Sequence, residues 1–430
     1  MPVNDLSLPP REKIFLADLH IHSRYSRATS KEMTIPTLAK AASAKGLDVI
    51  ATGDFTHPDY FSELQELLEP AEEGLYVFRE LPEGPRFVLS AEVSNIFSQG
   101  DKRNRRVHTV ILAPSLEVAA EINQALAPLG NLEADGRPVF GFPVKELVKI
   151  LRHISPEIIV IPAHVWTPWY SLFGAFSGFD SVEECFEEET PFIYALETGL
   201  SSDPPMNWRL SALDRFTLVS NSDAHSPGKL GREANAFYRP LSYPAMMKAL
   251  REDALAFTIE FFPEEGKYHF DGHRSCGVLL APEETRRHGG RCPVCGEPLT
   301  VGVMHRVEEL ADRPAGFKPP QKPPAVHLVP LIEIVAEALG KGVQTQAVKR
   351  TYQQLLELGG KEFDLLLYKD LDEISEKFPA RIIQGIRRVR EGQLYIRPGF
   401  DGVYGKISIF SPEEEDSSSK PRQQSLFGFS

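Results

Sequence analysis

The strongest constraint on the fold is an alternation of short apolar runs with amphipathic stretches between residues 13 and about 260. The runs have the length of strands and the stretches that of helices, a pattern typical of a parallel α/β fold. Seven runs suggest an α/β barrel: KIFLA, LDVIATG, RFVLSA, RVHTVILA, EIIVIPA, FIYALE and FTLVSN. Between them we predict helices at 36–45, 115–127, 145–153 and 243–255, several of which begin at Pro or Ser.

Residues that can bind metal ions stand at the ends of these predicted strands. In a barrel of parallel strands these ends converge on one face, where such folds place their active sites. In DLHIHS, two histidines two positions apart point to the same side of an extended segment. We therefore expect a shared metal centre with candidate ligands His20, His22, Asp54, His57, Glu92, His164, Asp223 and His225. Asp18 either orients a ligand histidine or caps its strand.

His108 stands at the start of its run, which is the wrong end of a purely parallel barrel. If 86–94 and 107–113 form an antiparallel hairpin, His108 returns to the end that carries Glu92. We predict that distortion. A lone histidine at a strand end is more often hydrogen-bonded within the protein than bound to a metal ion. The whole set of histidines and carboxylates at these strand ends nevertheless indicates a metal site. Its mixture of imidazole and carboxylate suits two or three divalent ions such as zinc, manganese, iron or magnesium.

Several cations close together favour phosphoester hydrolysis. They can clamp the attacking and leaving oxygens, and they lower the pKa of bound water from about 15.7 toward 7, so we expect attack by a metal hydroxide. We assign the catalytic part of the centre to Glu92, Asp223 and His225. The sequence contains neither a Ser nucleophile elbow nor the P-loop GxxxxGK[ST], so acyl transfer and nucleotide-driven work are poorly supported.

The motifs DLHIHS, TGD, SAEVS, PAH and NSDAH resemble those of the polymerase and histidinol phosphatase (PHP) superfamily. The resemblance covers the first 260 residues and implies a distorted seven-stranded (β/α)7 barrel with a trinuclear metal centre. One departure concerns the second strand, where the superfamily commonly has adjacent Asp-His, whereas Phe55 follows Asp54 here. His57 is a candidate substitute or a solvent-facing loop histidine. The resemblance carries ligand positions to His20, His22, Asp54, Glu92, His108, His164, Asp223 and His225.

Two ligand pairs later in the chain, His273-x2-Cys276 and Cys292-x2-Cys295, predict one structural zinc in a ribbon or knuckle. His269 or His288 could replace His273 as the fourth ligand. A closed site of this kind would contact nucleic acid or another domain, or would stabilise a segment too short to build a core. The few cysteines indicate a reducing compartment rather than a disulfide framework.

Composition changes along the chain predict four parts: a metal-dependent phosphoesterase barrel at 1–262, the zinc module at 263–315, a mostly helical DNA-contacting domain at 325–410, and a disordered tail at 411–430. The Pro-rich GFKPPQKPP at 316–324 is interpreted as a stiff linker. In the helical part we predict helices in LIEIVAEALGKG, TQAVKRTYQQLLELGG and ARIIQGIRRVREGQ, and a strand in VYGKISIF.

Together with the barrel, GKYHFDGHRSCG, CPVCGEPLTVGVMHRVEELADR and IRPGFDGVYGKI resemble the endonuclease Q family over nearly the full chain. That family incises DNA 5′ of deaminated bases such as hypoxanthine, uracil and xanthine, and of abasic sites. The resemblance implies a metal-dependent endonuclease of DNA repair. The metal ligands alone also allow a small-molecule phosphatase of the histidinol-phosphate type, and a catalytically inactive DNA scaffold is the alternative outside enzymes.

An enzyme that inspects a base extrudes it and stacks its face. Candidate DNA contacts are the aromatic residues after His164 and two basic clusters, with core packing and solvated charge as the alternatives: Trp166, Trp169, Arg103, Arg105, Arg106, Arg387 and Arg388. The terminal QQSLFGFS resembles a sliding-clamp-binding peptide of either bacterial or archaeal form, with anchors Gln423, Leu426, Phe427 and Phe429.

The formal net charge of -13 argues against a nonspecific basic coat, so DNA binding must use local clusters. We see no secretion signal and no apolar run approaching the roughly 18 residues that a membrane span needs. We therefore expect a cytoplasmic, nucleoid-associated protein without a membrane partner.

Overall fold

A mixed α/β body takes up most of the molecule. The computed structural model describes residues 3, 6–99, 103–411 and 414. The largest sheet follows the order β15-β12-β11-β1-β2-β5-β4-β3, and β6, β7 and β8 join it through β5 and β6. Its strands are β1 (Ile14–Asp18), β2 (Val49–Ala51), β3 (Leu68–Pro70), β4 (Tyr76–Phe78), β5 (Arg86–Gln99), β6 (Arg103–Ala113), β7 (Val139–Phe140), β8 (Ile159–Pro162), β11 (Ala234–Tyr238), β12 (Leu255–Glu260) and β15 (Ala325–His327).

The seven predicted strands are all confirmed, the last two as the small parallel sheet of β9 (Ala195–Glu197) and β10 (Thr217–Val219). β1, β2 and β5 pair in parallel, and their side chains are almost completely buried because both faces are covered. Among the described residues, the segment after β8 meets β9 through the bond from Val165 N to Glu197 O (2.9 Å), and the segments after β1 and β10 meet at the bridge Ile21–Ala224. The closed seven-stranded barrel stays a prediction.

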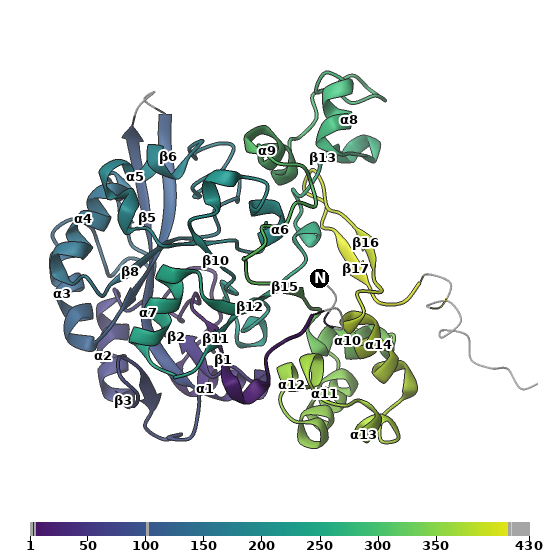
Figure 1. The fold of residues 1–430 in the computed structure, drawn as a ribbon, viewed down its shortest axis with the longest axis horizontal. Helices are drawn as coiled ribbons and strands as arrows, with labels where there is room; N and C mark the ends of the chain where they lie inside the picture. Colours follow the sequence, from purple (N-terminus) through teal and green to yellow (C-terminus); the bar gives the residue numbers. More distant parts are fainter. Residues whose placement is uncertain (1–2, 4–5, 100–102, 412–413, 415–430) are drawn as a thin grey trace, which may run out of the picture.

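The predicted antiparallel distortion of the sheet is confirmed. β5 and β6 form a long hairpin in which Ser94 lies opposite His108. Glu92 is two residues from Ser94 and therefore points to the same face, so Glu92 and His108 share one side of the hairpin. The hairpin is the tall pair of strands in the left half of Figure 1.

Helices cover the outer side of the sheet (Figure 1). The four predicted helices are confirmed, and in 144–154 the buried residues Val144, Leu147, Val148 and Leu151 have the spacing of one helix face. The helices of the body are α1 (Ile35–Lys45), α2 (Pro58–Leu67), α3 (Leu116–Leu126), α4 (Val144–Ile154), α5 (Val182–Phe186), α6 (Pro204–Asn207) and α7 (Tyr243–Glu252).

A small lobe follows the body at the upper right of Figure 1, and its last helix contributes Val303 and Val307 to the main hydrophobic core. It comprises β13 (Asp271–His273), β14 (Val278–Leu280), α8 (Pro282–Arg287) and α9 (Val303–Leu310). Its own hydrophobic cluster has only three buried members, Val278, Cys292 and Leu299. Such a core is too small to hold a fold by itself, so the lobe needs another source of stability.

The C-terminal lobe is helical, as predicted, and lies below the small lobe in Figure 1. The three predicted helices and the predicted strand are present, and the sequence did not predict α12, α13 and β16. The elements are α10 (Leu331–Ala338), α11 (Gln346–Gly359), α12 (Glu362–Leu367), α13 (Asp372–Ser375), α14 (Ala380–Arg390), β16 (Tyr395–Arg397) and β17 (Lys406–Ser408).

The Pro-rich segment at 316–324 contacts the body, and the domain boundary expected there stays a prediction. Residues 311–324 contain no helix or strand, yet Lys322 bonds to Phe216 O (2.9 Å) and to Asp253 (2.6 Å) on the body. Residues 325–327, expected in the helical domain, form β15 and pair in parallel with β12. The Pro-rich segment is therefore attached to the body through Lys322. Within the described part of the chain, no helix has the length and apolarity that crossing a membrane requires.

Candidate metal centre

The structure brings seven of the predicted metal ligands together at one end of the sheet. They come from the segments that follow β1, β8 and β10 and from the β5–β6 hairpin, although up to 205 positions separate His20 from His225 along the chain. They form three groups with shared members, each with ligand atoms within 4.8 Å of one another: His20, His22 and Glu92; His22, Asp223 and His225; Glu92, His108 and His164.

Glu92 lies at the middle of this cluster and is 1% exposed. Its Oε1 lies 2.8 Å from His108 Nδ1 and 3.1 Å from His164 Nε2, and its Oε2 lies 3.3 Å from His22 Nε2. Bonds of about 2 Å from one ion to two ligands leave those ligands roughly 3 Å apart. The spacing therefore fits ions between these groups, with one Glu92 oxygen serving each side.

Two buried carboxylates orient the histidines of DLHIHS. His20 Nδ1 lies 3.0 Å from each carboxylate oxygen of Glu197, and His22 Nδ1 lies 3.1 Å from Asp54 Oδ1. Because a carboxylate accepts hydrogen bonds, Nδ1 carries the proton and Nε2 presents its lone pair. Both Nε2 atoms are buried and have no hydrogen-bond partner. This is the arrangement expected of metal-binding histidines.

Asp223 and His225 complete the cluster on its more open side. Asp223 Oδ1 lies 3.1 Å from His22 Nε2, and the Asp223 side chain is 28% exposed. Its Oδ1 is buried and lacks a hydrogen-bond partner. His225 Nδ1 donates to the carbonyl of Asp223 at 2.9 Å, which leaves Nε2 available to a ligand. Asp223 is therefore the carboxylate that an incoming substrate can reach most easily.

Backbone strain coincides with the cluster. Asp54, His164 and Asp223 adopt left-handed conformations with φ of 46°, 33° and 46°. Such conformations are uncommon outside glycine and gather at functional sites, where the surrounding structure holds them in place. They turn the three side chains back toward the ends of the strands that precede them.

The electrostatics of the cluster favour bound cations. Although burial opposes it, the carboxylates Glu197 and Glu92 raise the pKa of His20 well above its ordinary value. Burial likewise opposes the ionised form of Glu92, yet His108 and Arg137 hold the pKa of Glu92 well below its ordinary range. The cluster thus keeps ionised carboxylates in a buried place, and a field that attracts protons also attracts divalent ions.

Asp54 and His57 lie outside these ligand groups of the described residues. Asp54 instead accepts bonds from Ser23 N (2.6 Å) and from Ser26 Oγ (3.0 Å) besides its contact with His22. His57 begins α2, where its ring lies 4.4 Å from the ring of Tyr25. In this arrangement Asp54 orients a ligand, and a ligand role for His57 stays a prediction.

The contacts of Asp18 bear on the two roles that the sequence left open, orienting a ligand histidine or capping β1. Asp18 accepts bonds from Ser222 N and Gly231 N, each at 3.0 Å, and so ties the end of β1 to the loops after β10. The interpretation as a capping residue fits these contacts. Two residues that contact the candidate ligands, Glu197 and Arg137, were not predicted from the sequence. Glu197 could have been found, because it ends a predicted strand just as the other site residues do.

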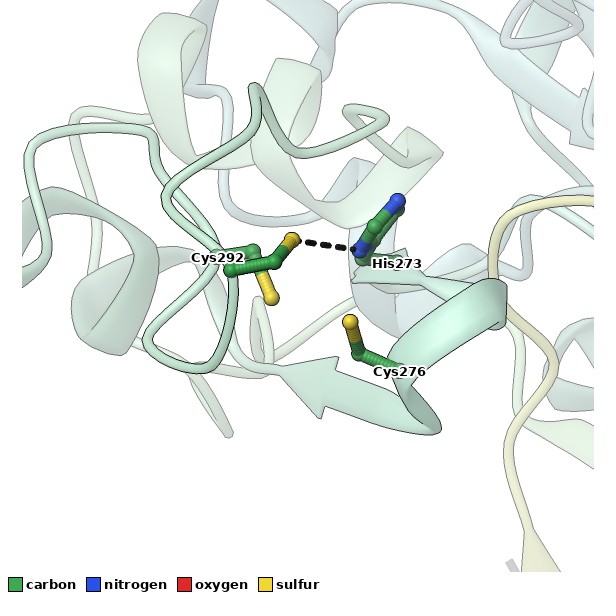
Figure 2. A group of neighbouring side chains, drawn as sticks. His273, Cys276 and Cys292 are labelled. Atoms are coloured by element: carbon green, nitrogen blue, oxygen red, sulfur yellow. Dashed lines mark hydrogen bonds between the residues drawn. The ribbon is translucent and has the colours of Figure 1, made fainter.

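The second candidate metal group lies in the small lobe. His273, Cys276, Cys292 and Cys295 place their ligand atoms within 4.8 Å of one another, and Cys295 Sγ lies 3.3 Å from His273 Nδ1. Figure 2 shows the side chains of His273, Cys276 and Cys292 pointing toward one another, the first two from one segment at and just after the end of β13 and the third from another loop. Neither His269 nor His288 belongs to this group. Although burial opposes it, the backbone N–H groups of Cys295 and Val294 lower the pKa of Cys292 to about 6, which favours a metal-binding thiolate.

A cavity of about 430 Å³ opens between the body and the small lobe. Its lining includes Thr167, whose Oγ1 lies 3.1 Å from Nδ1 of His164, so the cavity adjoins the metal centre. Burial lowers the pKa of His269 to about 4, so this lining imidazole is neutral near pH 7, and its buried Nδ1 has no hydrogen-bond partner. Trp169, Tyr268 and Tyr404 supply aromatic surface.

The two tryptophans predicted to contact DNA differ in exposure. Trp166 is 1% exposed and bonds to Asn207 Oδ1 at 2.8 Å, so in this structure it is a core residue. Trp169 is 47% exposed and stacks on Phe176, itself 59% exposed, with ring centroids 4.3 Å apart. This exposed pair is the part of the loop that a nucleic acid could reach.

The predicted basic residues mostly have partners within the chain. The guanidinium of Arg105 lies 4.2 Å from the ring centroid of Phe179, and that of Arg106 lies 5.3 Å from that of Tyr170. Arg387 pairs with Asp372, and Arg388 makes two bonds of 2.8 Å to Glu414. The side chain of Arg103 and the peptide residues Gln423, Leu426, Phe427 and Phe429 lie outside the described residues.

Comparison with known proteins places these sites in a family. Residues 330–393 match the family described as the MJ0043 C-terminal domain. A crystal structure of the lesion-specific endonuclease PfuEndoQ from Pyrococcus furiosus is 32% identical, with a TM-score of 0.82, and the match covers 94% of this chain and 99% of that one. A structure of endonuclease Q with a 27-mer duplex substrate carrying an abasic lesion at the active site is 33% identical, with a TM-score of 0.80 over 94% and 98% of the two chains.

A relative in Methanocaldococcus jannaschii, the uncharacterized protein MJ0043, is 34% identical over 257 residues. That match covers 58% of this chain but only 32% of the relative, so this chain corresponds to about a third of that protein. The two endonuclease structures, in contrast, are matched over nearly their whole length. Their likeness extends through the body, the small lobe and the helical lobe, and the chain therefore belongs to the endonuclease Q family of metal-dependent DNA repair endonucleases.

Proposed function

We propose that this enzyme hydrolyses the DNA phosphodiester on the 5′ side of a deaminated base (hypoxanthine, uracil or xanthine) or of an abasic site. The observation that carries the proposal is the buried cluster around Glu92, in which His20 Nε2, His22 Nε2 and Asp223 Oδ1 have no hydrogen-bond partner. The endonuclease Q bound to an abasic duplex supports the choice of damaged DNA, because it is similar to this chain over 94% of its length.

The residues of the cluster fit two or three divalent cations (zinc, manganese, iron or magnesium), held by His20, His22, Glu92, His108, His164, Asp223 and His225. Bound there, such ions would lower the pKa of a water molecule and neutralise charge on the phosphate. Glu197 and Asp54 hold the first two histidines through their Nδ1 atoms, which leaves the Nε2 atoms directed at the cluster. Asp223, on the open side, faces the substrate, and Glu92 holds the two sides of the centre together.

The group of His273 and the three cysteines fits one structural zinc. Four protein ligands close the coordination sphere and leave no position for a reacting water. The lobe's hydrophobic cluster of three residues supports this role, because such a segment needs a covalent or metal cross-link to stay folded.

The cavity beside His164 is the place that we propose for an extruded base. Its volume of about 430 Å³ is suited to a nucleobase, and Trp169, Tyr268 and Tyr404 provide faces for stacking. The neutral His269 can exchange a hydrogen bond with the edge of the base. Arg103, Arg105 and Arg106 on β6 would contact phosphates, and Arg387 and Arg388 would do so on α14. We propose a sliding clamp as the partner of the terminal peptide.

The proposed reaction is tested with labelled duplexes that contain one deoxyinosine, one deoxyuridine or one abasic site, incubated with manganese or magnesium. We expect a single incision 5′ of the lesion and none in the undamaged duplex of the same sequence. If all three damaged duplexes remain intact, the proposal is wrong.

Replacing Asp223 by Ala distinguishes the proposal from the two alternatives. We expect the variant to bind the abasic duplex but to incise it at least about 100-fold more slowly, because the loss of a metal ligand removes transition-state stabilisation. A phosphatase of the histidinol-phosphate type would instead release phosphate from monoesters. A scaffold without catalysis would behave identically with and without Asp223.

A further inference from the structure

A short loop segment, Asp135–Gly136–Arg137, lies beside the candidate metal centre and brings the Arg137 side chain to Glu92. Gly136 N donates to Tyr25 O at 3.1 Å, and Gly136 O accepts from Thr56 Oγ1 at 3.3 Å. These bonds attach the segment to the residues that follow β1 and β2, both of which carry residues of the centre. Three parts of the chain are thereby fixed together.

Gly136 lets the segment approach more closely than any other residue would. A Cβ at this position would lie 2.5 Å from Asp54 Oδ2 and 2.5 Å from Ser26 Oγ. Both atoms are buried in the hydrogen-bond network that orients His22, so they cannot move aside at little cost. The absence of a side chain at 136 therefore sets the position of the next residue, Arg137.

Arg137 places a guanidinium at the centre. Its Nη1 donates to Glu92 Oε2 at 2.9 Å, so a permanent positive charge touches the carboxylate that joins the two sides of the cluster. The side chain is 29% exposed, whereas Glu92 has no exposed side-chain surface. Arginine has five N–H donors in a planar fork, and one bond to Glu92 leaves others for a second anion.

We propose that Arg137 is a catalytic residue that binds the non-bridging oxygens of the scissile phosphate. A guanidinium pairs with phosphate through two parallel bonds and stabilises the charge that develops there during hydrolysis. Its bond to Glu92 holds the side chain ready at the open edge of the centre. This inference rests on the proposal that the centre hydrolyses a phosphodiester, and it names the protein group that contacts the reacting phosphate.

The test compares Arg137→Ala and Arg137→Lys with Arg27→Ala as the matched control. Arg27 is 83% exposed and pairs with Asp135 at 3.5 Å, so its loss perturbs the same segment without removing the guanidinium at Glu92. In single-turnover incision of the abasic duplex we expect Arg137→Ala to be about 100- to 1000-fold slower, as for the loss of one oxyanion donor. Arg137→Lys should recover part of the rate, added guanidinium should partly rescue the Ala variant, and Arg27→Ala should match the wild type.

Two readouts that do not depend on incision complete the test. Calorimetric titration of the purified holoenzymes with inorganic phosphate should give affinity at least about 10-fold weaker for Arg137→Ala, because a charge-assisted pair is lost. Metal content, measured by mass spectrometry, should be the same in both proteins. Unchanged phosphate affinity, or a slower rate that follows a matching loss of metal, would show that Arg137 only positions Glu92 and would overturn the proposal.

A second variant, Gly136→Ala, tests the position of Arg137 without removing the arginine. Gly136→Ala retains the arginine but moves it away from the centre, so we expect slower incision and weaker phosphate binding with an unchanged circular-dichroism spectrum. Wild-type behaviour of Gly136→Ala would contradict the argument from close approach. If the wild type itself incises no damaged duplex, the proposed function fails, and the phosphate titration still decides whether Arg137 binds this anion.

Discussion

One buried carboxylate, that of Glu197, connects two residues of the candidate metal centre. Glu197 contacts His20 Nδ1 with both oxygens, accepts a bond of 2.8 Å from His164 N, and accepts another of 2.8 Å from Asn221 Nδ2. One buried carboxylate thus fixes two residues of the centre. Such outer partners typically change metal affinity or activity by 10- to about 100-fold when they are replaced.

We predict that Glu197→Gln lowers the metal affinity of the centre by about 10-fold or more, because a neutral amide holds the His20 N–H less strongly than a carboxylate does. The measurement is competitive metal titration against a chelating dye. Glu189→Gln is the matched control, since Glu189 is also buried but pairs with Arg152 at 3.3 Å, away from the centre. Equal affinities in the two variants would contradict the prediction.

A second buried carboxyl should make stability depend on pH. Burial raises the pKa of Glu260 from its ordinary value of 4.5 to about 7, against hydrogen bonds from Ser220 and Thr258. The folded protein therefore holds this proton more tightly than the unfolded chain does. The stabilisation is complete below pH 4.5 and is lost as the pH rises toward 7.

We predict that Glu260→Gln reduces this decline. Urea unfolding of the wild type should give a free energy of unfolding that falls between pH 4.5 and 7, and the Gln variant should give a flatter profile over the same window. Identical slopes in the two proteins would show that the buried carboxyl is not the titrating group.

Among the elements, the long β5–β6 hairpin does most to build the centre. Parallel pairing would have left His108 at the far end of the sheet, whereas the antiparallel turn returns it to within 2.8 Å of Glu92. In the small lobe, by contrast, the strands contribute little to the candidate metal site. Its strands β13 and β14 are short, and its three-residue hydrophobic cluster contains one of the candidate zinc ligands, Cys292.

We predict that Cys292→Ser removes the bound metal of the small lobe and makes residues 267–302 sensitive to limited proteolysis, because the metal replaces a core there. Cys185→Ser is the control, since Cys185 is the remaining cysteine and lies buried in the main core. Zinc analysis and peptide mapping give the readout. A Cys292→Ser protein that keeps its metal and its protease resistance would contradict the assignment.

At the scale of the whole molecule, the body and the helical lobe share one hydrophobic core, whose members run from β1 through α14. A buried ion pair crosses between them: Lys45 on α1 lies 2.8 Å from Glu362 on α12. Glu362 also accepts bonds from Leu331 N (3.0 Å) and Tyr352 Oη (2.7 Å). The helical lobe therefore packs on the body through a shared core and a buried ion pair.

We predict that Glu362→Ala lowers the free energy of unfolding by about 3–5 kcal/mol, because Lys45 would remain buried without its partner. Replacing both residues, as Lys45→Met with Glu362→Leu, should restore much of the loss. Glu252→Ala, which removes an exposed pair with Lys248, should change stability by less than about 0.5 kcal/mol. Chemical denaturation measures all three, and a loss for Glu362→Ala as small as the control would contradict a linking role.

The sequence by itself determined the local elements and most of the cluster. Strand-length apolar runs, helix-spaced apolar residues and ligands at strand ends depend on neighbours in the chain, so DLHIHS, NSDAH and the Cys pairs could be recognised without a structure. The direction of the β5–β6 hairpin was also accessible, since His108 would otherwise lie away from the other ligands.

Tertiary structure alone decided which residues surround the ligands. The contacts of Glu197 with His20, of Arg137 with Glu92 and of Lys45 with Glu362 join positions 177, 45 and 317 residues apart. The return of 325–327 to the main sheet is equally distant in sequence. Local propensity cannot encode such pairings, because each depends on how whole elements pack and on which buried charge or donor then needs a partner.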